Sequence, residues 1–227
     1  MREIVLDTET TGLDPKNGHR VVEIGCVELL NHVATGETYH CYINPQRPMP
    51  TEAERIHGLS DAFLADKPVF AAVAEGFLEF IASAPLIIHN ASFDLGFLNM
   101  ELEKIARPVI APDRAIDTVK LARRKFPGAP ANLDALCRRF GVDLSVRTKH
   151  GALLDSELLA EVYLELVGGC QPGLTLDQSA TRAAAEGVAP EAVPQVRPAR
   201  PHAASDPESA AHTAFVENMK NPIWHRP

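Results

Sequence analysis

The chain has 227 residues, of which 45% are hydrophobic and 23% are charged. This composition is typical of one globular domain of ordinary size with an appendage. No apolar run approaches the roughly 20 residues of a transmembrane helix, and no signal peptide precedes the first strand, so we expect a cytoplasmic protein with no membrane partner. The net charge of −8 disfavours a protein that holds nucleic acid by itself, because such proteins usually carry a basic surplus.

Apolar runs and turn residues predict three strands in succession, followed by helices that alternate with two short strands. We expect strands at 3–9, 21–30, 37–44, 86–89 and 115–116, and helices at 60–66, 69–83, 92–107, 118–126, 132–140 and 151–167. This order favours an α/β fold with a mixed five-stranded sheet and flanking helices.

The composition changes after residue 169. Residues 171–210 contain no aromatic residue, but six prolines and ten alanines, and such a stretch buries too little apolar surface to offset its ordering entropy. We therefore expect a folded domain at 1–169, a flexible, disordered linker at 170–205 and a C-terminal helical anchor within 206–227. Ala211, Phe215 and Met219 follow one another at helical spacing, and the only tryptophan, Trp224, comes shortly after them. This stripe is too small to fold alone, which is typical of a segment that binds a groove on a partner.

The first strand carries two acidic residues at its end. Asp7 and Glu9 are two positions apart, so both carboxylates project from the same face of a strand. Two like charges at the end of a buried strand are unfavourable without a neutralising cation, and a hard divalent metal ion is the natural partner of carboxylate oxygens. For an isolated Asp-x-Glu, two solvated residues at a loop edge would be the better interpretation.

Two further carboxylates stand on the core side of predicted helices. Asp94 and Asp155 are each followed, three and four positions later, by apolar residues on the same helical face, and a buried carboxylate is rare unless it is paired or bound to a metal. Four acidic side chains without obvious counterions suit a two-metal site for phosphoryl chemistry. His150 must precede the last helix to face the same site as Asp155, and a histidine on such a loop is suited to general-base work.

Together these residues resemble a known family. Three motifs stand in order along the chain: Asp7-x-Glu9, Asn90-Ala-Ser-Phe-Asp94 and His150-x-x-x-x-Asp155. In this they resemble the DEDDh 3′–5′ exonucleases, over about residues 2–169. The resemblance implies an RNase H-like fold, two Mg²⁺ or Mn²⁺ ions on the four carboxylates, His150 as general base, and release of nucleoside monophosphates from a 3′ end. It also implies that a group of residues lines the pocket for the terminal nucleotide: Thr10, Ile56, His57, Asn90 and Phe93.

More narrowly, residues 4–12, 88–97, 133–137 and 147–161 resemble the proofreading epsilon subunits of bacterial DNA polymerase III. That resemblance implies a DNA 3′ end as substrate and the polymerase alpha subunit as the partner of Phe215, Met219 and Trp224. The hexapeptide 171–176, with Gln171, Leu174 and Leu176, resembles the peptides that bind the bacterial sliding clamp, although it lacks a terminal phenylalanine, so we expect weak binding. Two alternatives remain: a free-standing exonuclease that trims RNA or short oligonucleotides, and an adaptor that bridges polymerase and clamp.

Overall fold

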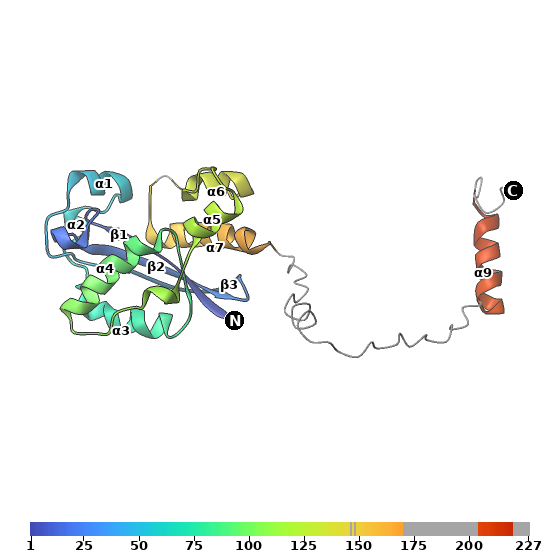
Figure 1. The fold of residues 1–227 in the computed structure, drawn as a ribbon, viewed down its shortest axis with the longest axis horizontal. Coiled ribbons are helices and arrows are strands. Elements are labelled where there is room, and N and C mark those ends of the chain that lie inside the picture. Colours follow the sequence, from blue (N-terminus) through green and yellow to red (C-terminus); the bar gives the residue numbers. More distant parts are fainter. Residues whose placement is uncertain (146, 148, 170–203, 220–227) are drawn as a thin grey trace, which may run out of the picture. The chain divides into compact units, whose positions relative to one another are not determined.

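The computed structural model of the chain describes residues 1–145, 147, 149–169 and 204–219 (Figure 1). The chain divides into two compact units, Met1–Leu174 and Thr175–Pro227. The clamp-like peptide, nearly all of the expected linker and Trp224 lie outside the described residues.

Five strands form one mixed sheet in the order β3-β2-β1-β4-β5. The strands are β1 (Arg2–Thr10), β2 (Val21–Leu30), β3 (Val33–Tyr42), β4 (Leu86–Ile88) and β5 (Ala115–Asp117). The first three are antiparallel, whereas β4 and β5 run parallel to β1. The predicted mixed five-stranded sheet is thus confirmed. One boundary was wrong: β3 begins at Val33, four residues early, because Asn31 and His32 alone form the turn with positive φ values of 53° and 69°, as tight hairpins require.

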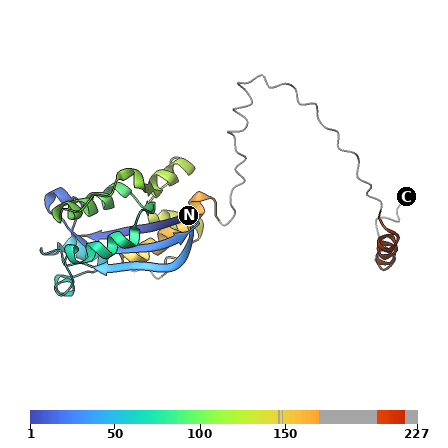
Figure 2. The same cartoon turned by 90° about the horizontal axis from the view of Figure 1, so that it is seen from below.

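Helices cover both faces of the sheet (Figures 1 and 2). One core lies under α3 (Phe70–Ile81) and α4 (Ala91–Lys104). The other lies under α5 (Thr118–Lys125), α6 (Leu133–Phe140) and α7 (Ala152–Val167). Two short 3₁₀ turns, η1 (Pro15–Asn17) and η2 (Pro112–Arg114), complete this part. These five helices confirm the predicted ones to within a few residues.

Two short helices stand near the carboxyl end of β1 (Figure 1): α1 (Thr51–His57) and α2 (Asp61–Leu64). The sequence predicted α2 but missed α1. The buried residues of α1 are Ala53 and His57, so this helix has no apolar period for a pattern to detect.

Strand β1 passes through the middle of the protein, and its side chains alternate between the two cores. Ile4 and Leu6 pack under α3 and α4, whereas Val5 packs under α6 and α7. The same alternation continues to the carboxyl end of the strand, where Thr8 faces α4 and the two acidic residues face α7.

Helix α7 lies directly against the backbone of β2 at Gly25. A Cβ atom on Gly25 would lie 2.2 Å from the carbonyl carbon of Ala152 and 2.2 Å from the amide nitrogen of Leu153. Ser156 adds a hydrogen bond of 2.9 Å from its Oγ to the Gly25 carbonyl oxygen. Because Gly25 is the register partner of Asp7, this contact fixes the start of α7 beside the end of β1.

The second unit contains α9 (Asp206–Glu217) among its described residues. Ser205 and Glu208 form a capping box at its start, and Pro207 lies in the first turn, where proline is tolerated. Phe215 is 63% exposed and Met219 is 40% exposed, but Val216 on the same helix is buried. Within the described parts of the chain, no helix is long and apolar enough to cross a membrane.

Candidate active site

Asp7 and Glu9 lie at the carboxyl end of β1, where their carboxylates share a face with α7. Glu9 is 9% exposed. Burial, together with repulsion from Asp155, Glu23 and Asp94, raises the pKa of Glu9 to about 8. Burial and the charge of Asp94 also raise the pKa of Asp7 well above its usual value. Neither carboxylate has an ion pair to a lysine or arginine within the described residues.

Asp94 reaches the same place from the first turn of α4. Asp94 is 2% exposed, and Thr8 donates a hydrogen bond of 2.7 Å from Oγ1 to Asp94 Oδ1. Burial outweighs that hydrogen bond and raises the pKa of Asp94 to about 7. The sequence missed Thr8 as a site residue, although its position between Asp7 and Glu9 on the strand points it to the opposite face, toward α4.

Asp155 completes the set from the first turn of α7, and here the sequence-based interpretation was wrong in one respect. Asp155 is 4% exposed but has a counterion. The Nε and Nη2 atoms of Arg147 lie 2.6 Å from its two carboxylate oxygens, while Nη1 donates to Asp134. Burial raises the pKa of Asp155, but the hydrogen bonds from Arg147 and His150 outweigh it and leave the pKa lowered. Arg147 was missed because it lies outside regular structure, where no periodicity marks its contacts.

His150 precedes α7, as predicted, and its side chain is 49% exposed. Its backbone N–H donates to the carbonyl oxygen of Ile56 over 3.3 Å, which joins this loop to α1. Its Nδ1 atom lies 3.2 Å from Asp155 Oδ2 and 2.8 Å from Arg147 Nη2. Glu9, His150 and Asp155 each offer a ligand atom, and these atoms lie within 4.8 Å of one another. The arrangement fits a divalent cation.

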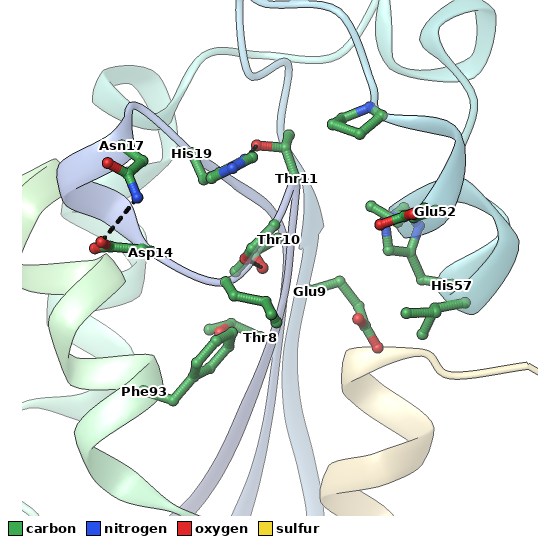
Figure 3. A pocket seen from close by; sticks show the side chains of 15 residues that line it. Thr8, Glu9, Thr10, Thr11, Asp14, Asn17, His19, Glu52, His57 and Phe93 are labelled. Atoms are coloured by element: carbon green, nitrogen blue, oxygen red, sulfur yellow. Dashed lines mark hydrogen bonds between the residues drawn. The ribbon is translucent and has the colours of Figure 1, made fainter.

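A pocket of about 490 Å³ opens on one side of Glu9 (Figure 3). Four of the five residues expected at a terminal nucleotide line it: Thr10, Ile56, His57 and Phe93. The backbone N–H of Leu59 donates to His57 Nδ1 over 3.0 Å, and burial lowers the pKa of His57. The neutral ring therefore carries its proton on Nε2. The sequence did not predict that the pocket is also lined by Leu13, which is 85% exposed.

A second pocket of about 410 Å³ shares Thr8 and Glu9 with the first. It brings together four of the five catalytic candidates, Asp7, Glu9, His150 and Asp155, with His89 and with Arg147, which sequence reasoning missed. Asp94 is not among its lining residues. Asn90, the fifth expected substrate residue, lies in neither pocket and instead lines a third cavity, next to the second.

Comparison with known proteins identifies the family of this chain. The family model described as "Exonuclease" matches residues 4–163. DNA polymerase III subunit epsilon of Rickettsia felis is 59% identical over 174 residues, which cover 75% of this chain and 76% of that protein. The chain belongs to the family of DNA polymerase III epsilon subunits. The Salmonella typhimurium subunit is 44% identical over 225 residues, covering 95% of this chain and 92% of its own length.

Solved structures of other exonucleases share the fold of this chain. The structure described as "Exonuclease X in complex with 5′ overhanging duplex DNA" is 27% identical, with a TM-score of 0.57 over 72% of this chain and 90% of that chain. The nuclease domain of 3′hExo, described as a DEDDh family member bound to rAMP, has a TM-score of 0.63 over 73% of this chain and 91% of that chain. It is 18% identical, so it shows the fold alone. The predicted RNase H-like exonuclease fold is confirmed.

Proposed function

We propose that this epsilon-family chain is a 3′–5′ exonuclease that removes nucleoside monophosphates from DNA 3′ ends and proofreads for a bacterial DNA polymerase III. One observation carries the proposal: the carboxylates of Asp7, Glu9, Asp94 and Asp155 converge with His150 beside a pocket large enough for a nucleotide. The relatives named as epsilon subunits favour DNA over RNA as the substrate. They also favour action in the cytoplasm as part of a replicative assembly.

The four carboxylates would hold two divalent ions, Mg²⁺ or Mn²⁺. Burial, together with repulsion between neighbouring carboxylates, raises the pKa values of Asp7, Glu9 and Asp94, and bound divalent ions would stabilise the ionised forms. When bound, paired cations stabilise the charge that develops on the attacking and departing oxygens of a phosphodiester. The residues present therefore fit the metals that the family implies.

The protein's own groups would position the substrate and move one proton. His150, which lines the carboxylate-bearing pocket just before α7, would accept the proton of the attacking water. The ring of Phe93 would stack on the terminal base, and the neutral His57 would donate a hydrogen bond from Nε2. Ile56 and Thr10 would complete the walls of the pocket. Thr8 holds Asp94 in place through its hydroxyl group.

Two substitutions test this function on a primer with a mismatched 3′ end. Asp7→Ala should nearly abolish release of nucleoside monophosphates in Mg²⁺, with the fold retained. His150→Ala should keep residual activity, because general-base catalysis contributes about 100- to 10,000-fold. Thr35→Ala, on an exposed strand far from the pockets in sequence, serves as the control. Full activity of Asp7→Ala in the presence of EDTA would exclude the proposed mechanism.

We further propose that the chain consists of a nuclease domain at 1–169, a linker at 170–205 and a polymerase-binding segment at 206–227. Phe215 on α9 and Met219 just after that helix are exposed, and together with Trp224 they suit burial in a groove of the polymerase alpha subunit. The peptide at 171–176 would give weak binding to the sliding clamp through Gln171, Leu174 and Leu176. The alternatives are less well supported, because the full set of carboxylates argues against a purely structural adaptor.

A further inference from the structure

A third cavity of about 570 Å³ lies beside the carboxylates and is not used in the function proposed above. Its walls come from the end of β4, the start of α4, α5 and the segment before α6. They include His89, Asn90, Ser92, Lys120, Arg123 and Asn132. We call this cavity the α5 groove.

The α5 groove continues the line of the two pockets at the active site. We call the pocket of about 490 Å³ the nucleotide pocket and the pocket of about 410 Å³ the carboxylate pocket. These two pockets share Thr8 and Glu9. The carboxylate pocket and the α5 groove share His89 and Asn132. A strand with its last nucleotide in the first pocket and its scissile phosphate at the carboxylates must continue into a neighbouring space. The α5 groove therefore adjoins the carboxylate pocket, and it shares no lining residue with the nucleotide pocket.

The charge of the α5 groove suits a phosphate backbone. Lys120 and Arg123, one turn apart on α5 and both exposed, share a face of the helix. Among the described residues that line the groove, the only carboxylate is that of Asp117. Its side chain is 10% exposed and accepts hydrogen bonds from the amides of Val119 and Lys120. Lys120 approaches Asp117 only to 3.9 Å. In a chain of net charge −8, this groove therefore presents positive charge next to the site.

The position of α5 is fixed relative to the carboxylates. Thr118, at the first position of α5, is fully buried, and its Oγ1 lies 2.9 Å from Nδ1 of His89 at the end of β4. Asn90 and Ser92, at the start of α4, are exposed and contribute polar groups to the lining. The fold thus holds the walls of the groove in place, with cationic and polar donors at defined positions.

We propose that the α5 groove binds the phosphates of the substrate strand upstream of the scissile bond, with Lys120 and Arg123 as the contacting cations. This inference rests on the exonuclease function proposed above. It gives a role to Asn90, which stands outside the nucleotide pocket. It also accounts for how an acidic protein holds a DNA strand, since the positive charge is concentrated on the path that the strand follows.

The test compares Lys120→Ala/Arg123→Ala with Arg124→Ala, a variant of the exposed neighbour outside the groove. The substrates are a single-stranded DNA dodecamer and the p-nitrophenyl ester of thymidine 5′-monophosphate, which has no upstream nucleotide. For the dodecamer, we expect the double variant to raise KM on the order of tenfold. We also expect the dependence of log(kcat/KM) on log[salt] to become shallower by about 1.4, since each phosphate contact to a single strand contributes about 0.7. Hydrolysis of the ester should stay unchanged.

Equal salt dependence in the double variant and Arg124→Ala would overturn the proposal. Equal loss on the ester and the dodecamer would also overturn it, because the effect would then not come from upstream contacts. Binding of a fluorescent dodecamer in Ca²⁺, followed by anisotropy, reports the same contacts without turnover. If the wild type binds the dodecamer with this salt dependence but does not hydrolyse it, the proposed function fails while the groove assignment stands.

Discussion

The guanidinium of Arg147 donates two hydrogen bonds of 2.6 Å to the carboxylate of Asp155, and both side chains are less than a tenth exposed. Among the described residues, Asp155 is therefore the one metal-ligand candidate that has a basic counterion. A divalent ion at Asp155 would neutralise part of the carboxylate charge that Arg147 neutralises in its absence. The stabilising effects of the metal ion and of Arg147 would therefore depend on each other.

The first prediction concerns this coupling. Arg147→Ala leaves the buried Asp155 without its arginine, which typically costs about 3–5 kcal/mol, so we expect a loss of that order in the free energy of unfolding in EDTA. In saturating Mn²⁺ the loss should be clearly smaller, because the metal then neutralises Asp155. Urea unfolding under both conditions measures the difference. Lys125→Ala, which removes a cation bonded to the end of α7, serves as the control and should lose the same amount in both. If Arg147→Ala loses the same free energy of unfolding in EDTA and in Mn²⁺, the metal and Arg147 stabilise the protein independently of each other.

The second prediction concerns pH. The pKa of Glu9 is about 8 in the folded protein and about 4.3 when unfolded, so the folded state binds more protons between these values. Its contribution to stability is therefore lost as the pH rises through this range. The lowered pKa values of His57 and His89 act in the opposite direction, but only below about pH 6.5.

In EDTA, the free energy of unfolding should thus fall between pH 6.5 and pH 8.5, on the order of 2 kcal/mol from Glu9 alone. Glu9→Gln should flatten the profile, and Mn²⁺ should reverse it because the metal requires ionised carboxylates. Urea unfolding at several pH values gives the slope. A free energy that rises over this interval in the wild type would contradict the raised pKa values.

The sequence revealed those parts of the site that depend on local periodicity. Alternation along β1 placed Asp7 and Glu9 on one face, and apolar neighbours at helical spacing marked Asp94 and Asp155 as buried. It could not reveal Arg147, whose contacts depend on how α6 and α7 pack. Helix α1 was missed for a related reason, since its buried face consists of an alanine and a histidine.

The contact of α7 with Gly25 was equally hidden, and it leads to the third prediction. Gly25→Ala places a methyl group 2.2 Å from the backbone of α7, so the helix must move and carry Asp155 with it. We expect a loss of about 1–3 kcal/mol in stability and, because misplacement by about 1 Å costs about 100-fold, a comparable fall in kcat.

The matched control is Gly76→Ala in α3, where a new Cβ would lie 3.6 Å from the ring of Tyr39, an ordinary contact. It should keep full activity and gain slightly in stability, since alanine is the better helix former. Nuclease assays with thermal unfolding separate the two effects. Wild-type kcat in Gly25→Ala would mean that the position of α7 does not limit catalysis.

The last prediction concerns α9. Phe215 is 63% exposed and Met219 is 40% exposed, and exposed aromatic residues of this kind often carry most of the binding energy of an interface. We expect Phe215→Ala combined with Trp224→Ala to weaken binding to the polymerase alpha subunit at least 30-fold, equivalent to about 2 kcal/mol. Thr213→Ala, an exposed change on the same helix, should leave binding unchanged.

Truncation after Gly169 should abolish binding, yet preserve hydrolysis of free single strands, because every described residue of the catalytic pockets precedes that point. On primers held by the polymerase, the truncated protein should be slow, since the tether supplies a high local concentration. Surface plasmon resonance on immobilised alpha subunit measures the binding. If the truncated protein binds as tightly as the full chain, the anchor lies in the nuclease domain.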